Sequence, residues 1–460
     1  MQLSYEELQV KIGFEIHIPL KTKRKLFCGC SAEYWKASSP NVNVCPVCTG
    51  MPGAKPWEVN KEAVVKAVAA ALMLHCKLEP KFVFLRKHYD YPDLPSGYQR
   101  TGTPLGRNGE LLGVRIREVH LEEDPGKYDP QGLVDYNRSG CPLAEVVTEP
   151  DIRSPEHARQ FLKELFRRLA YAGICIDKPG TVRFDINVSV LGKNRVEIKN
   201  VNSIKGAYNA LVYEILRQKR LIEQGQEVRR ETRAYLESQM ITVPMRYKET
   251  EEDYRYIPDP DIPPIIITEE IVRAAEEYVR EMPETAAARL KQQYGLPDEI
   301  IEKLIISKKN VQYFEELVQH FPEPLTAARW FVEHVYWQMN LHDLEADELK
   351  LTPRRLAQLL QLLKEGKISD YVAKELIKRL VLEDVEPIEI IKRESLEKQE
   401  EDVERIVREI LAQHRKAVQD YKSGKKEAIN FLVGQVMKAT RGRIDPRTAR
   451  QLLEKFLNEQ

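Results

Sequence analysis

Hydrophobic and polar residues alternate with a period of two through much of the first 265 residues, and this pattern predicts β-strands. In VKIGFEIHIPL, residues 10–20, one face carries the apolar side chains Val10, Ile12, Phe14, Ile16 and Ile18. The opposite face carries Lys11, Glu15 and His17. TVRFDINVSVL (181–191) and RVEIKN (195–200) alternate in the same way. Each strand therefore has one buried face and one face free for chemistry.

Two stretches with helical periodicity interrupt these strands, at residues 60–74 and 154–173. The second begins with Ser154 as a helix N-cap and ends at Gly173. Strands interrupted by helices in this way favour an α+β fold, with a mixed sheet and helices on one side of it.

The pattern changes after YIPDPDIPPIIIT, residues 256–268, whose four prolines exclude a helix or a central strand and predict a domain edge. Beyond it the chain is almost wholly helical, as in residues 351–367, where Thr352 is the expected N-cap and Gly366 ends the helix. An acidic run near residue 400 suggests a second boundary. We expect three domains: a mixed-sheet domain at 1–290, a helical domain at 291–400 and a small helical tail at 401–460.

Composition limits the classes of partner. Lysine plus arginine equals aspartate plus glutamate, at 71 each, so a polyanion must be met by a local patch rather than by an overall field. The longest apolar run, residues 67–74, is far too short to span a membrane. The N-terminal segment lacks the apolar core of a signal peptide, and we expect a soluble cytoplasmic protein.

Four of the seven cysteines lie within 21 residues, as two close pairs separated by a loop. This spacing is typical of a structural zinc site with four thiolate ligands: Cys28, Cys30, Cys45 and Cys48. The alternative is a group of buried free cysteines. We interpret the others as small core residues: Cys76, Cys141 and Cys175.

A second candidate site consists of acids on strands. Glu15 and His17 are two residues apart on one strand face, hence roughly 7 Å apart and pointing the same way. Further carboxylates occur in strand or strand-end contexts: Glu123, Glu145, Glu149 and Asp185. If the strands are neighbours, these groups form a hard-ligand site for magnesium or manganese with nucleotide phosphates. The residues leave open an alternative, a polar sheet face neutralised by Arg117, Arg183 and Lys199.

The common nucleotide and hydrolase motifs are absent. No G-x-x-x-x-G-K-[ST] occurs, and PGKY at 125–128 lacks the upstream glycine of a P-loop. Neither G-x-G-x-x-G nor G-x-S-x-G is present. Any ATP chemistry must therefore use another architecture.

Several segments together resemble the GatB family, the B subunits of glutamyl/aspartyl-tRNA amidotransferases. They include GFEIH, KLFCGCSAEY, NVCPVCTGMPGA, HLEEDPGK, RFDINVSV, EIKNVNSIKGA and FLVGQVMKATRGRIDP. The matching segments occur in family order from about residue 12 to 446, so the resemblance covers nearly the whole chain. It implies a cradle-shaped kinase domain, a helical middle domain and a helical tail.

The resemblance also implies an activity and its cofactors. The family uses ATP to phosphorylate the side-chain carboxylate of misacylated Glu-tRNA(Gln) or Asp-tRNA(Asn), and then replaces the phosphate with ammonia. Glutamine is the amide donor, and magnesium and structural zinc are the expected ions. Whether Glu-tRNA, Asp-tRNA or both are substrates is not written in these motifs.

Residue roles follow from the same resemblance. It implies that magnesium is held by residues matching Glu15, His17, Glu123 and Glu145, with Asp185 nearby as a further catalytic residue. Glu122 and Asp124 either support this set or are solvated neighbours. We expect nucleotide contacts from Lys87, Arg183 and Lys199. The chain departs from the family pattern at His88 and Asp90, which add titratable groups near the pocket.

Partners are implied as well. The chain shows no amidase signature, so we expect a separate glutaminase, the A subunit, and a small C subunit, in a three-subunit complex. Residues 421–450 hold eight lysines and arginines against two acids, which suits contact with tRNA phosphates. The candidate contacts are Lys438, Arg441, Arg443 and Arg447. A solvated basic face is the alternative.

Two other functions compete with this one. The first is a noncatalytic, zinc-containing RNA-binding protein with structural acids, and the second is a metal-dependent phosphohydrolase of small molecules. The candidate magnesium ligands favour the amidotransferase over the noncatalytic RNA-binding protein, which would not need them for catalysis. The basic tail favours it over the phosphohydrolase, because an enzyme of small molecules does not need such a surface.

Overall fold

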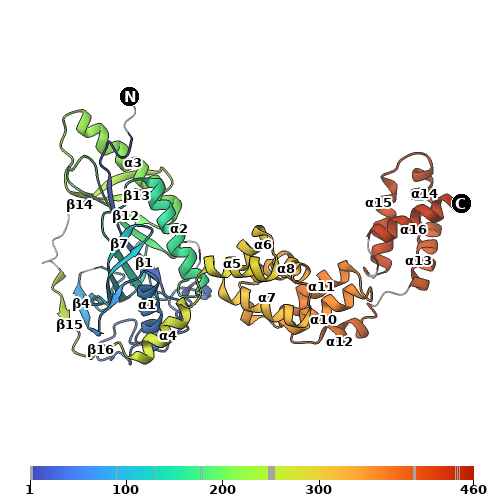
Figure 1. The fold of residues 1–460 in the computed structure, drawn as a ribbon, viewed down its shortest axis with the longest axis horizontal. Coiled ribbons are helices and arrows are strands. Elements are labelled where there is room, and N and C mark those ends of the chain that lie inside the picture. The colour runs from blue at the N-terminus through green and yellow to red at the C-terminus, as the bar shows by residue number, and fades with distance from the viewer. Residues whose placement is uncertain are drawn as a thin grey trace. The chain divides into compact units, whose positions relative to one another are not determined.

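The computed structural model describes residues 4–89, 91–129, 131–176, 178, 180–246, 254–396, 400–440, 442, 444 and 446–459. The chain divides into two compact units, Met1–Pro283 and Glu284–Gln460. The described part of the first unit is a sheet with helices and a four-cysteine cluster, and that of the second is helical (Figure 1). The predicted order, a mixed-sheet region followed by an all-helical region, is confirmed.

Among the described residues of the first unit, twelve strands form one sheet, in which the main path runs β14-β13-β12-β11-β1-β10-β7-β5-β4-β15 and the short β2 and β6 join through β7. β12 and β13 are parallel and the other pairs are antiparallel, so the sheet is mixed. The strands are β1 (Lys11–Pro19), β2 (Lys77–Leu78), β4 (Phe84–His88), β5 (Tyr98–Gly102), β6 (Gly106–Leu111), β7 (Val114–Glu123), β10 (Pro142–Thr148), β11 (Arg183–Ser189), β12 (Val196–Val201), β13 (Glu231–Leu236), β14 (Ile241–Arg246) and β15 (Ile257–Pro258). Two small ribbons pair β3 (Lys81–Phe82) with β16 (Ile265–Ile266) and β8 (Lys127–Tyr128) with β9 (Val134–Asp135).

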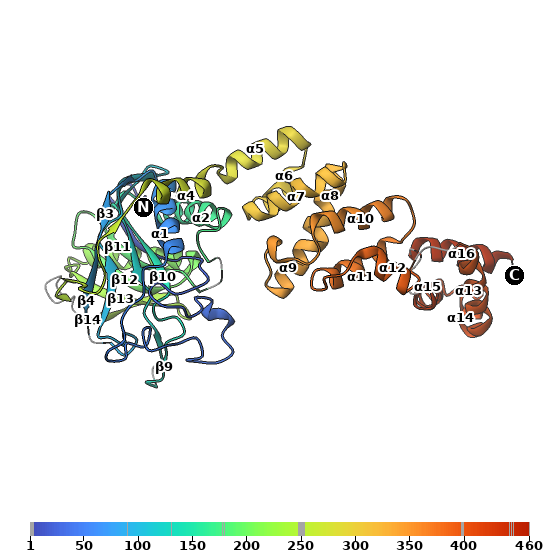
Figure 2. The same cartoon turned by 90° about the horizontal axis from the view of Figure 1, so that it is seen from below.

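One face of this sheet is covered by helices, as Figure 2 shows for α1, α2 and α4. The helices of the unit are α1 (Lys61–Met73), α2 (Pro155–Tyr171), α3 (Ile204–Glu223) and α4 (Glu269–Val279). The predicted apolar face of β1 lies in this core, where Ile12, Phe14 and Ile16 are at most 1% exposed. Ser154 caps α2 as predicted, because its side chain accepts a hydrogen bond from the backbone N–H of His157. The helices leave the polar face of the sheet open for the candidate site.

The proline-rich segment at 256–268 is not a domain boundary. Its prolines restrict it to edge pairing, so β15 ends the main sheet beside β4, and β16 pairs with β3. The chain then enters α4, which packs on α1, and leaves the first unit only at Pro283. The proline run thus marks edge strands here rather than the predicted domain edge.

The described helices of the second unit follow the predicted periodicity and caps. Thr352 accepts a hydrogen bond from the backbone N–H of Arg355, and Gly366 has a positive φ of 69° after the helix end. The helices are α5 (Pro283–Tyr294), α6 (Asp298–Leu304), α7 (Lys308–His320), α8 (Pro324–Trp330), α9 (Tyr336–His342), α10 (Pro353–Lys364), α11 (Asp370–Leu380), α12 (Pro387–Arg393), α13 (Glu400–Gln413), α14 (Arg415–Lys422), α15 (Ala428–Ala439) and α16 (Pro446–Glu459). α13 to α16 share an apolar cluster of their own. In the part of the chain that the structure describes, no helix has both the length and the apolar content to cross a bilayer.

Candidate active site and metal centre

A row of polar side chains crosses four neighbouring strands on the open face of the sheet. His17 of β1 lies opposite Glu145 of β10 on one side and Arg183 of β11 on the other. Glu145 in turn lies opposite His120 of β7. Residues directly opposite each other on paired strands share a face. The register therefore gathers groups that are up to 166 positions apart in the chain, between His17 and Arg183.

The first carboxylate group consists of His17, Glu122 and Glu145, whose ligand atoms all lie within 4.8 Å of one another. The Nδ1 atom of His17 is buried and has no hydrogen-bond partner. Burial lowers the pKa of His17, so its imidazole is neutral, the form that binds metal ions. Burial and the charge of Glu122 raise the pKa of Glu145. A divalent cation fits this group, because it relieves the repulsion of the acids and satisfies the free nitrogen.

A second carboxylate group lies beside the first and consists of Glu15, Asp185 and Glu197. Burial, followed by the charges of Glu145 and the other two acids, raises the pKa of Glu15 to about 7. The ammonium of Lys199 lies 2.6 Å from a carboxylate oxygen of Asp185 and 3.7 Å from one of Glu197. Lys199 therefore already neutralises part of this second group, which needs a cation less than the first.

Glu123 does not join either group. Successive residues of a strand point to opposite faces, so Glu123 of β7 points away from the face that His120 and Glu122 share. Its carboxylate oxygens lie 3.3 and 3.4 Å from a guanidinium nitrogen of Arg100. The expected place of Glu123 beside His17 and Glu145 is taken by Glu122, which is 2% exposed.

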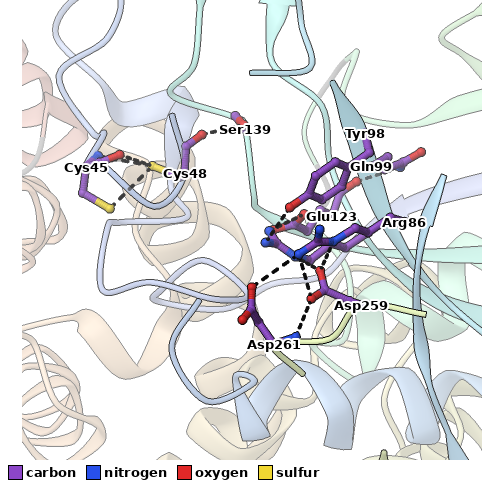
Figure 3. Close-up of polar contacts among 10 residues, drawn as sticks. Cys45, Cys48, Arg86, Tyr98, Gln99, Glu123, Ser139, Asp259 and Asp261 are labelled. Carbon is purple, nitrogen blue, oxygen red and sulfur yellow. Dashed lines mark hydrogen bonds and ion pairs between the residues drawn. The ribbon is translucent and has the colours of Figure 1, made fainter. Parts of the chain in front are cut away.

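The ion pair of Glu123 extends into a buried network at the edge of the sheet. Arg100 donates to Asp259 at 2.8 Å, and Arg86 donates to the same carboxylate at 3.0 Å. Arg86 also reaches Asp261 at 3.3 Å. Figure 3 shows Arg86, Glu123 and Asp259 pointing toward one another. This network joins β4, β5 and the end of β7 to the proline-rich segment.

Of the residues expected to contact a nucleotide, Lys87 and Arg183 lie near the first carboxylate group, whereas Lys199 pairs with the second. Although burial opposes the change, the charge of Glu122 raises the pKa of Lys87. Arg183 forms an ion pair with Asp124, which is 2% exposed and therefore not a solvated neighbour. Glu149 lies outside both groups and pairs with Arg117 at 2.8 Å.

The four clustered cysteines also converge. Their Sγ atoms all lie within 4.8 Å of one another, and those of Cys45 and Cys48 are 3.9 Å apart. Tetrahedral zinc with bonds of about 2.3 Å requires sulfur separations of about 3.8 Å, so the cluster fits this ion. A hydrogen bond from the Cys28 thiol lowers the pKa of Cys48 and raises that of Cys28, so Cys48 is the thiol of this pair that ionises first. The other three cysteines are buried and lie outside this cluster.

Comparison with known proteins gives a consistent result over the whole chain. Residues 10–273 match the family model described as the GatB/GatE catalytic domain, and residues 312–457 match the one described as the GatB domain. The B subunit of the aspartyl/glutamyl-tRNA(Asn/Gln) amidotransferase from Methanopyrus kandleri is 50% identical, with 98% of this chain and 99% of that protein covered. The corresponding protein of Methanocaldococcus jannaschii is 48% identical, with 99% of each covered. The chain belongs to the GatB family.

As a member of this family, the chain is the catalytic subunit of an amidotransferase that amidates misacylated tRNA. The resemblance inferred from the sequence motifs is confirmed. Both carboxylate groups and the four cysteines lie inside the region that matches the catalytic domain. Membership of the GatB family also implies a complex of several subunits.

Sequence reasoning missed several residues of this GatB-family chain. The alternation of RVEIKN already predicts that Glu197 lies on the face opposite the buried side chains of β12, so Glu197 could have been predicted as a member of the polar face. The strand period of HLEE, counted from His120, likewise points to Glu122. No sequence signal linked Arg86, Arg100 and Asp259, which come from three separate segments.

The remaining predicted site residues lie outside the carboxylate groups and the cysteine cluster. Lys438 and Arg447 are exposed on the tail, while Arg441 and Arg443 lie outside the described residues. Asp90 also lies outside them. The Nδ1 atom of His88 lies 2.9 Å from the backbone carbonyl oxygen of Arg255, so this histidine contributes to a loop contact.

Proposed function

We propose that this chain phosphorylates the side-chain carboxylate of aspartate or glutamate on misacylated tRNA and then amidates it. A carboxylate oxygen of the aminoacyl group attacks the γ-phosphorus of ATP, and ADP leaves. Ammonia then attacks the acyl carbon, the C–O bond to phosphate breaks, and the nitrogen loses a proton. The activation is required because a carboxylate is a poor acyl donor.

The observation that carries this proposal is the pair of carboxylate groups on the open sheet face of a catalytic-domain match. His17, Glu122 and Glu145 would hold one magnesium ion, with Glu122 replacing Glu123 in the ligand set expected from the sequence. Magnesium, when bound, screens the repulsion between the carboxylate and the triphosphate. The buried nitrogen of His17 that lacks a partner supports this assignment.

Three cations in this region suit the nucleotide or its product. Lys87, beside Glu122, supplies positive charge next to the proposed ion. Arg183 and Lys199 are held by Asp124 and Asp185, which fixes their side chains before substrate arrives. Fixed charges stabilise developing negative charge better than mobile ones, because little reorganisation is needed.

The other proposed roles are structural support, ammonia supply and tRNA binding. The four cysteines hold a structural zinc ion, since four thiolates leave no open coordination position. Ammonia comes from a glutaminase, the A subunit, which a small C subunit joins to this chain. The exposed Lys438 and Arg447 contact tRNA phosphates from a separate tail domain at 401–460, the part of the chain with its own apolar cluster. Residues 291–400 form the helical domain between the tail and the cradle.

ADP release tests the proposal. The chain with its partner subunits, ATP and magnesium should release ADP with Glu-tRNA(Gln) or Asp-tRNA(Asn) but not with uncharged tRNA. The species that triggers release identifies the substrate. Glu149→Gln is a matched control, because Glu149 is an acid directly after β10 that lies outside both groups and pairs with Arg117. Equal ADP release with charged and uncharged tRNA would show an ATPase without the proposed transfer.

A further inference from the structure

Lys25 is an ammonium group placed where charge is unfavourable. In the sequence Lys25 lies three residues before Cys28, the first cysteine of the cluster. The residue is 0% exposed. Removing an ammonium from water is strongly unfavourable unless nearby groups replace both its hydration and its counter-charge. The surroundings of Lys25 should therefore contain an anion.

The partners of Lys25 do not include an acid. Its Nζ atom donates to the backbone carbonyls of Asn43 at 2.8 Å and Tyr136 at 3.1 Å, and to the Sγ atom of Cys48 at 3.4 Å. Within the described part of the chain, no carboxylate forms an ion pair with it. The two carbonyls replace hydration but carry no charge. The sulfur of Cys48 is thus the one partner able to be an anion.

We propose that Lys25 is the built-in counter-ion of the four-cysteine zinc centre and donates an N–H···S hydrogen bond to the Cys48 thiolate. One zinc ion and four thiolates leave two negative charges in a mostly buried site. A buried ammonium at hydrogen-bond distance neutralises one of them. The inference rests on the proposed zinc ion, but it assigns to Lys25 a role that the four ligands do not imply.

The same side chain connects the zinc centre to the reacting face. Tyr136, whose carbonyl accepts from Lys25, begins the turn that contains Ser139 and Gly140. Ser139 donates from its hydroxyl to the carbonyl of Cys48 at 2.9 Å (Figure 3). The N–H of Gly140 donates to the carbonyl of Asp124 at 2.9 Å. Asp124 follows Glu122 and Glu123 and pairs with Arg183, so a series of hydrogen bonds links the surroundings of Lys25 to the end of β7.

Zinc release from the full-length chain tests the inference. Lys25→Met removes the charge and keeps most of the apolar volume, and Lys23→Met is the matched control on an exposed lysine of the same segment. Lys25→Met should release zinc to an excess of chromogenic chelator at least ten-fold faster than the natural chain, and Lys23→Met at an unchanged rate. Equal release by both variants would overturn the role of Lys25. A natural chain without zinc would instead refute the zinc centre itself.

A second pair of variants separates charge from packing. Cys45→His replaces one thiolate by a neutral imidazole and removes one negative charge from the centre. In this background Lys25→Met should accelerate zinc release by less than three-fold. If Lys25→Met alone fails to fold, the same comparison applies to the yield of folded chain, which the Cys45→His change should restore. An equal defect in both backgrounds would show that Lys25 acts by packing and would overturn the inference.

Discussion

Replacing Glu122 with glutamine should make the metal-free chain more stable while disabling it as an enzyme. The ligand oxygens of Glu122 and Glu145 lie within 4.8 Å of each other. Two unit charges at this distance repel by about 3 kcal/mol at an effective dielectric constant of about 20. The raised pKa of Glu145 and the charge of Lys87 reduce this repulsion. We therefore expect Glu122→Gln to raise the free energy of unfolding by about 1 kcal/mol or more.

Glu123→Gln is the matched comparison, one position along the chain and on the opposite face. It removes one carboxylate from Arg100, which is 7% exposed and keeps Asp259 at 2.8 Å. Weakening a buried, charge-assisted hydrogen bond lowers stability by about 1–3 kcal/mol. The two neighbouring substitutions should thus change the stability of the metal-free chain in opposite directions.

Thermal unfolding with and without magnesium measures both effects. The natural chain and Glu123→Gln should gain stability from magnesium, and Glu122→Gln should gain little. ADP release with misacylated tRNA should fall at least about 100-fold in Glu122→Gln, as expected when a metal ligand is lost. A magnesium response that is kept in Glu122→Gln and lost in Glu123→Gln would refute the ligand set drawn from this geometry.

Three further predictions follow from the same structure. The raised pKa of Glu15, about 7 against an ordinary value of 4.5, means that the folded chain binds more protons than the unfolded chain between these pH values. Stability in metal-free buffer should therefore fall by about 3 kcal/mol as the pH rises from 4.5 to 7, and denaturant titrations should show a flatter profile for Glu15→Gln. Cys28→Ser should abolish zinc binding, measured by metal content, and lower the unfolding temperature; an unchanged temperature would exclude a structural role for the ion. Lys438→Ala combined with Arg447→Ala should raise the KM for tRNA and reduce the salt dependence of binding by about one unit of log–log slope per lost phosphate contact. Lys455→Ala, on the same tail but paired with Glu404, is the control.

The sequence was sufficient wherever a local rule determines structure. The alternation in β1 predicted its buried and open faces, and the caps at Ser154 and Thr352 predicted where helices begin. The cysteine spacing predicted a convergent cluster because both pairs are local. These features depend on residues a few positions apart, where backbone geometry fixes which side chains meet.

Features that depend on tertiary pairing were less accessible. Three adjacent acids at 122–124 have three different environments: a carboxylate group, the Arg100 network and the Arg183 ion pair. Strand period places Glu122 on the face of His120 and Glu123 on the other face, and the register of β7 against β10 shows that the face of His120 is the one that carries Glu145. The proline-rich segment predicts a domain edge until its pairing with β4 is known.

Oxygen transfer from the substrate to phosphate tests the central claim most directly. The aminoacyl group of the misacylated tRNA is prepared with ¹⁸O in its side-chain carboxylate, and the complex is supplied with ATP, magnesium and an ammonia source. If the chain forms an acyl phosphate, the attacking oxygen stays with phosphorus when ammonia displaces it. The released phosphate should then carry one ¹⁸O atom for each amide formed. Amide formation with unlabelled phosphate would contradict phosphorylation of the carboxylate and with it the proposed role of the open sheet face.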